Sequence, residues 1–170
     1  MPGWFSVNVA DAPAFKHEIA GTYVPFESRD ERFPDYGINI HVLQPGEPNG
    51  RYHRESVQED FLVLAGECIG IIDGAEHRFR AWDFVHCPPG TGHAFVGAGD
   101  GPCVLLCTGE RDFDDETFWR VSPRSEIALR YGASVERDAS SDAEARSPWR
   151  DHWRVERPGN WDELPWSSAS

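Results

Sequence analysis

The sequence has no long apolar run and almost no lysine. No window approaches the roughly 20 apolar residues that a membrane-spanning helix needs, which excludes a transmembrane protein. Lys16 is the one lysine, and 16 basic residues stand against 29 acidic ones, for a net charge of -13. Nucleic-acid-binding proteins normally carry a basic face, so DNA, RNA and anionic membranes are poor partners. The first residues lack a basic leader and an apolar segment, so we expect no export signal and a cytoplasmic protein.

The cysteines lack the C-x-x-C spacing that is typical of thiolate zinc sites. All of them lie among apolar, strand-like residues, at positions 68, 87, 103 and 107. In a reducing compartment such residues remain free thiols and pack as small apolar side chains. We therefore expect four free, buried cysteines.

Helical periodicity is absent from residues 36–110. β-Branched residues come there in short bursts divided by glycine and proline, which predicts strands. The pair Asp73-Gly74 predicts a hairpin turn. No stretch is long enough for a helical crossover, so a parallel sheet is disfavoured and an all-β sandwich or barrel is favoured. The strands are expected at 36–43, 59–65, 68–73, 77–81, 83–87, 93–96 and 102–108, with one more candidate at 4–9.

Residues 111–170 have a different pattern, helical at first and then rich in tryptophan. Ser122 can cap a helix that has Pro123 in its first turn and ends at Gly132. Ser141 and Glu144 have the spacing of a capping box. Disordered tails are usually poor in aromatic residues, so we expect the tail to pack on the barrel or on a partner subunit. The tryptophans in question are Trp149, Trp153, Trp161 and Trp166.

Four chemically active side chains follow a pattern that can bring them together. His53, Glu55 and Glu59 all stand at odd-numbered positions, and residues two apart on a strand point to the same face. His93 follows a Pro-Pro-Gly turn at the start of another strand. Two imidazoles and two carboxylates in one cavity would make a divalent-metal site with nitrogen and oxygen ligands.

Residues 50–97 resemble the two sequence motifs of the cupin superfamily. In the first motif, Gly66 follows Glu59 after six residues, Glu55 takes the place of the second histidine, and His53 takes the place of the first. In the second motif, the spacing of Pro88, Gly90 and His93 matches. The resemblance implies a double-stranded β-helix (jelly-roll) barrel in residues 1–110 and a homodimer, and the pattern of residues 111–170 adds a short helical extension.

Three positions depart from the motifs of the family. Glu55 replaces a ligand histidine, Trp82 replaces the leading glycine of the second motif, and Gly97 replaces its closing asparagine. A carboxylate can still coordinate a metal, so the resemblance implies a divalent ion (Mn, Fe, Ni or Zn) held by His53, Glu55, Glu59 and His93. The other interpretation is a metal-free cupin whose cavity groups bond to each other and to water.

The remaining histidines are weaker candidates. His41 could line the cavity, although the pattern leaves its face undecided, and His86 is expected to face outward or to lie at the rim. His17, His77 and His152 are expected at the surface.

Two functions remain open, because one fold hosts many activities. The first is a metal-binding cupin that binds a small, oxygen-rich molecule and acts as an isomerase or dioxygenase. The second is a non-catalytic binding or sensing module without metal.

Overall fold

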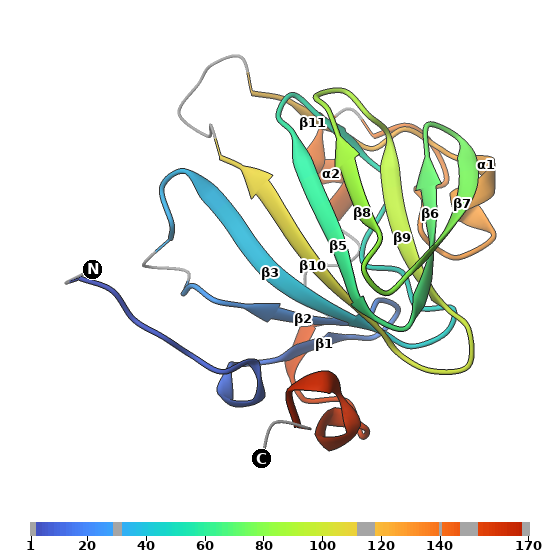
Figure 1. The fold of residues 1–170 in the computed structure, drawn as a ribbon. Helices are drawn as coiled ribbons and strands as arrows, with labels where there is room; N and C mark the ends of the chain where they lie inside the picture. Colours follow the sequence, from blue (N-terminus) through green and yellow to red (C-terminus); the bar gives the residue numbers. More distant parts are fainter. Residues whose placement is uncertain (1–2, 29–31, 112–117, 140, 147–152, 168–170) are drawn as a thin grey trace.

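Two antiparallel sheets face each other and enclose the core (Figure 1). The computed structural model of the chain describes residues 3–28, 32–111, 118–139, 141–146 and 153–167. The larger sheet has the order β12 (Trp153–Val155), β1 (Phe15–His17), β2 (Thr22–Pro25), β3 (Tyr36–Leu43), β10 (Cys103–Glu110), β5 (Glu59–Ala65) and β8 (Phe84–Cys87). The smaller sheet has the order β7 (Ala75–Arg80), β6 (Glu67–Ile72) and β9 (His93–Ala98). A separate ladder pairs β4 (Arg54–Glu55) with β11 (Arg120–Val121). The predicted all-β, jelly-roll class is confirmed.

Helices are short and lie outside the sheets. They are η1 (Val9–Asp11), α1 (Glu126–Leu129), α2 (Asp142–Arg146), η3 (Trp161–Glu163) and η4 (Pro165–Ser167). No helix in the described ranges is long and apolar enough to cross a membrane.

Alternation along the strands divides the core into an inner and an outer part. On β3, Ile40 and Val42 pack on the outer face of the larger sheet, and Leu43 packs between the sheets. The inner cluster includes the aromatic pair Phe61 and Phe95, whose rings are 4.4 Å apart. It also holds all the cysteines, which are free and buried as predicted.

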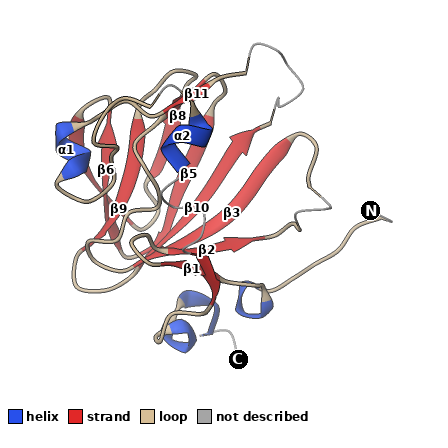
Figure 2. Ribbon diagram, turned by 180° about the vertical axis from the view of Figure 1, so that it is seen from behind, coloured by secondary structure: helices blue, strands red, loops and turns tan. Residues whose placement is uncertain are grey.

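The tail covers the outer face. Trp161 and Leu164 are buried against Ala12 and Ala14, in the same cluster as Ile40 and Val42. Figures 1 and 2 show η3 and η4, red in Figure 1, beneath β1 and β2. The tail also adds β12 to the sheet, next to β1. The described part of the tail thus packs on its own barrel, whereas Trp149 lies outside the described residues.

Most predicted boundaries hold within one or two residues, and the ranges 36–43 and 59–65 match β3 and β5. The hairpin turn at Asp73-Gly74 is confirmed by its positive φ angles of 44° and 79°. The Ser141 cap is confirmed as well, because its hydroxyl accepts from the Glu144 N–H over 3.2 Å.

Two predicted elements are wrong. Residues 4–8 form no strand, and η1 starts at Val9, where the Asn8 side chain caps the first turn. Helix α1 is capped by Ser125 rather than Ser122, because the Ser122 carbonyl accepts instead from the Ala139 N–H over 3.1 Å.

Candidate metal centre

His53 and His93 stand directly opposite each other. The two residues exchange both backbone N–H···O hydrogen bonds, of 3.2 and 2.9 Å, in an isolated antiparallel bridge. Opposed residues of such a pair send their side chains to the same face. Their rings therefore lie 4.5 Å apart, centroid to centroid, and both are almost fully buried.

Each ring has one nitrogen hydrogen-bonded to a backbone carbonyl. His53 Nδ1 lies 2.8 Å from the Arg51 carbonyl oxygen, and His93 Nδ1 lies 3.1 Å from that of Thr91. A carbonyl only accepts, so each Nδ1 carries a hydrogen, and Nε2 is the nitrogen of each ring that faces the site. The same arrangement orients metal-binding histidines in general.

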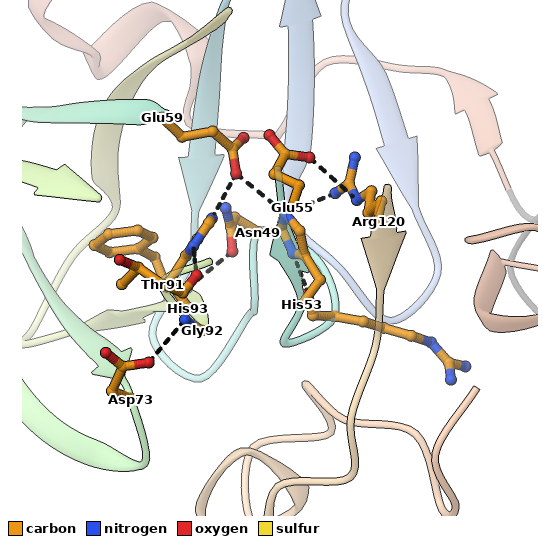
Figure 3. A network of polar contacts seen from close by, with 11 residues as sticks. Asn49, His53, Glu55, Glu59, Asp73, Thr91, Gly92, His93 and Arg120 are labelled. Carbon is orange, nitrogen blue, oxygen red and sulfur yellow. Dashed lines mark hydrogen bonds and ion pairs between the residues drawn. The ribbon is translucent and has the colours of Figure 1, made fainter. Parts of the chain in front are cut away.

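Glu59 comes from the opposite sheet and faces the Nε2 atoms of both rings. Its Oε2 lies 2.8 Å from His93 Nε2 and 3.2 Å from His53 Nε2 (Figure 3). Gly109, its neighbour on β10, makes room for this side chain, since a Cβ there would stand 3.3 Å from the Glu59 Cγ. Three electron-pair donors therefore converge on one point between the sheets.

The pKa values of His53 and Glu59 are both lowered. Burial lowers the pKa of His53 to about 4, and the charges of Arg120 and His93 act in the same direction. Burial alone would raise the pKa of Glu59, but its contacts with the two rings outweigh burial and hold that pKa well below its usual range. At neutral pH, His53 is then neutral and Glu59 is ionised.

This donor set fits a divalent cation. His93 Nε2 is buried and lies 2.8 Å from a carboxylate oxygen of Glu59. Either a proton or a cation between the two atoms makes such a contact favourable. Neighbouring ligands at right angles around an ion, with bonds of about 2.1 Å, stand about 3 Å apart, which matches both contacts of Glu59. His53, Glu59 and His93 could thus hold a metal ion.

Glu55 does not join this group. Its carboxylate turns to Arg120, whose Nε lies 3.6 Å from Glu55 Oε2. The parity argument placed Glu55 on the same face as His53, but Glu55 lies on β4 and pairs there with Arg120 of β11. Figure 3 shows the Glu55 carboxylate paired with the Arg120 guanidinium.

Arg120 is the site residue that the sequence did not indicate. Its Nη2 donates to His53 Nε2 over 2.8 Å, so it contacts one of the candidate ligands directly. The residue belongs to the extension, and β11 is too short for a strand pattern to be recognised.

The other histidines divide as follows. His41 lies on the inner face, opposite to Ile40 and Val42, and burial lowers its pKa to about 4 against the opposing charge of Glu59. His86 faces outward, as expected, and its Nδ1 lies 2.6 Å from an Asp60 oxygen. His77 is exposed, as expected.

The surface prediction for His17 is wrong, because Trp153 of the tail packs against its ring at 4.8 Å. His152 lies outside the described residues.

Residues 39–109 match the family of the cupin domain. This part of the chain is a cupin domain. No curated protein matches the sequence.

Solved structures share the cupin fold at low sequence identity. The polyketide cyclase RemF from Streptomyces resistomycificus is 12% identical, with a TM-score of 0.57 over 98% of this chain and 97% of that one. An RmlC-like cupin from Shewanella frigidimarina is 17% identical, with a TM-score of 0.54 over 65% and 93% of the two chains. A predicted oxalate decarboxylase from Thermotoga maritima is also 17% identical, with a TM-score of 0.54 over 62% and 98%.

The structure explains both glycine-related departures from the cupin motifs. Trp82 has a left-handed backbone that favours glycine, with φ of 75°, in a turn closed by the hydrogen bond from the Asp83 N–H to the Arg80 carbonyl. At Gly97 no larger residue fits, since a Cβ would stand 2.3 Å from the Gln44 carbonyl oxygen.

Proposed function

We propose that this chain is a metal-dependent cupin enzyme that acts on a small, oxygen-rich molecule, as an isomerase or a dioxygenase. His53, Glu59 and His93 would hold the metal. The observation that carries the proposal is the convergence of these three side chains, whose ligand atoms all lie within 4.8 Å of one another.

Two imidazoles and one carboxylate are the ligand set of many non-haem iron sites, and they leave coordination positions for a substrate. Ferrous iron or manganese therefore suits the set best, with nickel and zinc as the other candidates. Such an ion supplies Lewis acidity toward a bound oxygen or a site for dioxygen chemistry.

The chain's own residues orient and shield the site. The Arg51 and Thr91 carbonyls fix the two ring orientations. Phe61 packs against His93 with its ring centroid 5.2 Å away, and it gives the inner side of the site an apolar wall. Arg120 and Glu55 form the polar side.

Elemental analysis and calorimetry test the metal. Protein purified without chelators should contain a divalent ion, and metal-free protein should bind manganese or ferrous iron. His93→Ala should weaken binding by more than the roughly tenfold to hundredfold that loss of an outer partner costs. His86→Ala, which removes an outward-facing histidine, is the matched control and should change nothing. Metal-free protein that takes up no manganese, iron, nickel or zinc would rule out the proposal.

A second function, ligand binding without metal, is favoured by one observation. The Arg120 guanidinium already uses the lone pair of His53, and so can stabilise the site without an ion. Ligand binding that survives chelation supports this alternative, and binding that chelation abolishes supports the enzyme.

We also propose a cytoplasmic homodimer. The free, buried cysteines fit a reducing compartment. An apolar row crosses the outer face of the larger sheet, through Leu106 and Leu62 to Phe84, and continues at Trp82. Phe84 is 64% exposed and Trp82 is 75% exposed on the edge strand and its preceding turn, which a second copy would cover.

A further inference from the structure

Two polar side-chain atoms on β3 are buried without a hydrogen bond. They are Asn39 Oδ1 and His41 Nδ1, and neither has a partner within the ranges that the structure describes. Buried polar atoms in proteins are usually paired, because an unpaired one has lost its bonds to water and gained nothing in return. Two such atoms on neighbouring positions of one strand therefore point to a partner from outside the chain.

Both atoms lie on the side of the larger sheet that carries the candidate metal ligands. Asn39 and His41 are two residues apart on β3 and share the inner face, since Ile40 between them packs on the outer one. Only β10 separates β3 from β5, the strand of Glu59 (Figure 1). The charge of Glu59 opposes the effect of burial on the pKa of His41, so the two groups interact across β10.

Two aromatic side chains adjoin His41. Tyr23 stands opposite His41 in the ladder of β2 and β3, and the two rings are 5.5 Å apart. The Trp153 ring lies 6.2 Å from that of Tyr23 and is 39% exposed, which leaves part of the indole accessible to a ligand. Binding sites for small molecules typically combine aromatic side chains with a few placed polar groups. This part of the inner face has both.

A hydroxyl group fits the two unpaired atoms. The amide oxygen of Asn39 only accepts, so its partner has to bring a donor, which excludes an ionised carboxylate or phosphate. Burial lowers the pKa of His41 to about 4, so the ring is neutral at pH 7 and its Nδ1 donates or accepts according to the tautomer. A hydroxyl both donates and accepts, and it therefore pairs with either atom.

We propose that Asn39 and His41 form a hydroxyl-binding subsite, and that the molecule bound at the candidate metal centre is polyhydroxylated. This inference rests on the proposed function and names its substrate class. An oxygen at one end of the molecule lies at the metal, and hydroxyl groups further along its carbon chain pair with Asn39 and His41. Tyr23 and Trp153 give that chain an apolar surface to pack on.

The test compares two acids on the cobalt-loaded protein. Gluconate and 2-hydroxyhexanoate have the same carbon chain, carboxylate and 2-hydroxyl group, but only gluconate carries hydroxyls along the rest of the chain. The visible absorption of Co²⁺ reports the binding of either one. Wild-type protein should bind gluconate at least about tenfold tighter, as two added hydrogen bonds require. Asn39→Leu and His41→Phe, which roughly keep the side-chain volume, should each reduce that preference by about fivefold, the usual value of one neutral hydrogen bond.

Stability separates a binding role from a structural one. Without ligand, Asn39→Leu and His41→Phe should both unfold at a higher urea concentration than the wild type at pH 7, because each removes an unpaired buried atom. Groups that served the fold would give the opposite shift, and such a shift in both variants would contradict the inference.

The matched control is Thr22→Val. Thr22 Oγ1 is also buried without a partner in the described part of the chain, but Thr22 pairs with Val42 and so faces the outer cluster. This variant should gain stability in the same way and leave the gluconate preference unchanged. An unchanged preference in both Asn39→Leu and His41→Phe means that water alone pairs with the two atoms, which overturns the inference and leaves the proposed function intact. Wild-type protein that takes up no Co²⁺ overturns both.

Discussion

At the scale of the residue, backbone carbonyls determine the chemistry of the site. The Arg51 and Thr91 carbonyls fix which nitrogen of each imidazole faces the site, and Glu59 completes the set of three candidate ligands there. These choices follow from the antiparallel bridge between His53 and His93. A change to the segment around Arg51 or to the one around Thr91 that leaves every ligand in place should therefore still weaken metal binding.

The buried histidines make the stability of the metal-free protein depend on pH. The pKa of His41 and that of His53 are both lowered to about 4. A histidine with a folded-state pKa below its unfolded value of about 6.5 contributes fully above pH 6.5, and that contribution is lost as pH falls toward 4. Urea denaturation should show the free energy of unfolding decreasing over this window, by roughly 3 kcal/mol for each histidine. His41→Gln should flatten the curve, and an equally steep curve in that variant would contradict the assignment.

At the scale of the element, Trp82 holds a turn in a conformation that suits glycine. A side chain in the left-handed region costs about 1–2 kcal/mol. Trp82→Gly should therefore be more stable than Trp82→Ala by about 1 kcal/mol, although glycine is normally the less stable of the two in a folded chain. Both variants lose the same indole, so chemical denaturation of the pair isolates the backbone term. Equal stabilities would show that the turn carries no strain.

The tail stabilises the outer face of the larger sheet. Trp161 is 5% exposed, packs 4.7 Å from the Trp166 ring and donates from Nε1 to the Ala10 carbonyl. Trp161→Ala should lower the free energy of unfolding by about 3–5 kcal/mol, the usual cost of removing a buried aromatic side chain. The control is Trp153→Ala, because that indole is 39% exposed and its loss should cost clearly less in the same denaturation experiment.

The sequence predicts those elements whose pattern is local. The range 59–65 and the Asp73-Gly74 turn are correct because alternation and turn chemistry act within a few residues. Local patterns do not predict the contacts of Glu55, Arg120 and His17. Their surroundings depend on the extension, where β11 pairs with β4 and β12 pairs with β1. Flanked by Lys16 and Glu18, His17 looks like a surface residue until Trp153 covers it.

At the scale of the whole molecule, the edge strand β8 of the larger sheet exposes apolar side chains. If the row that ends at Phe84 forms the dimer interface, light scattering should give about twice 19.1 kDa at micromolar concentration. Phe84→Asp should shift the protein to monomer, because a charge directly opposite its own copy is costly to bury. Val155→Asp makes the same kind of change on the other edge strand and should leave the dimer intact. A wild-type monomer of 19.1 kDa would contradict the proposal.

The outer cluster joins Ala12 and Ala14 to Trp161 and Leu164, and this has a consequence for biosynthesis. Strands β2 and β3 leave the ribosome long before residue 164 exists. At about 5–20 residues per second, their outer face waits on the order of ten seconds for its cover. During translation this apolar face is therefore a natural place for a chaperone to bind until Trp161 docks.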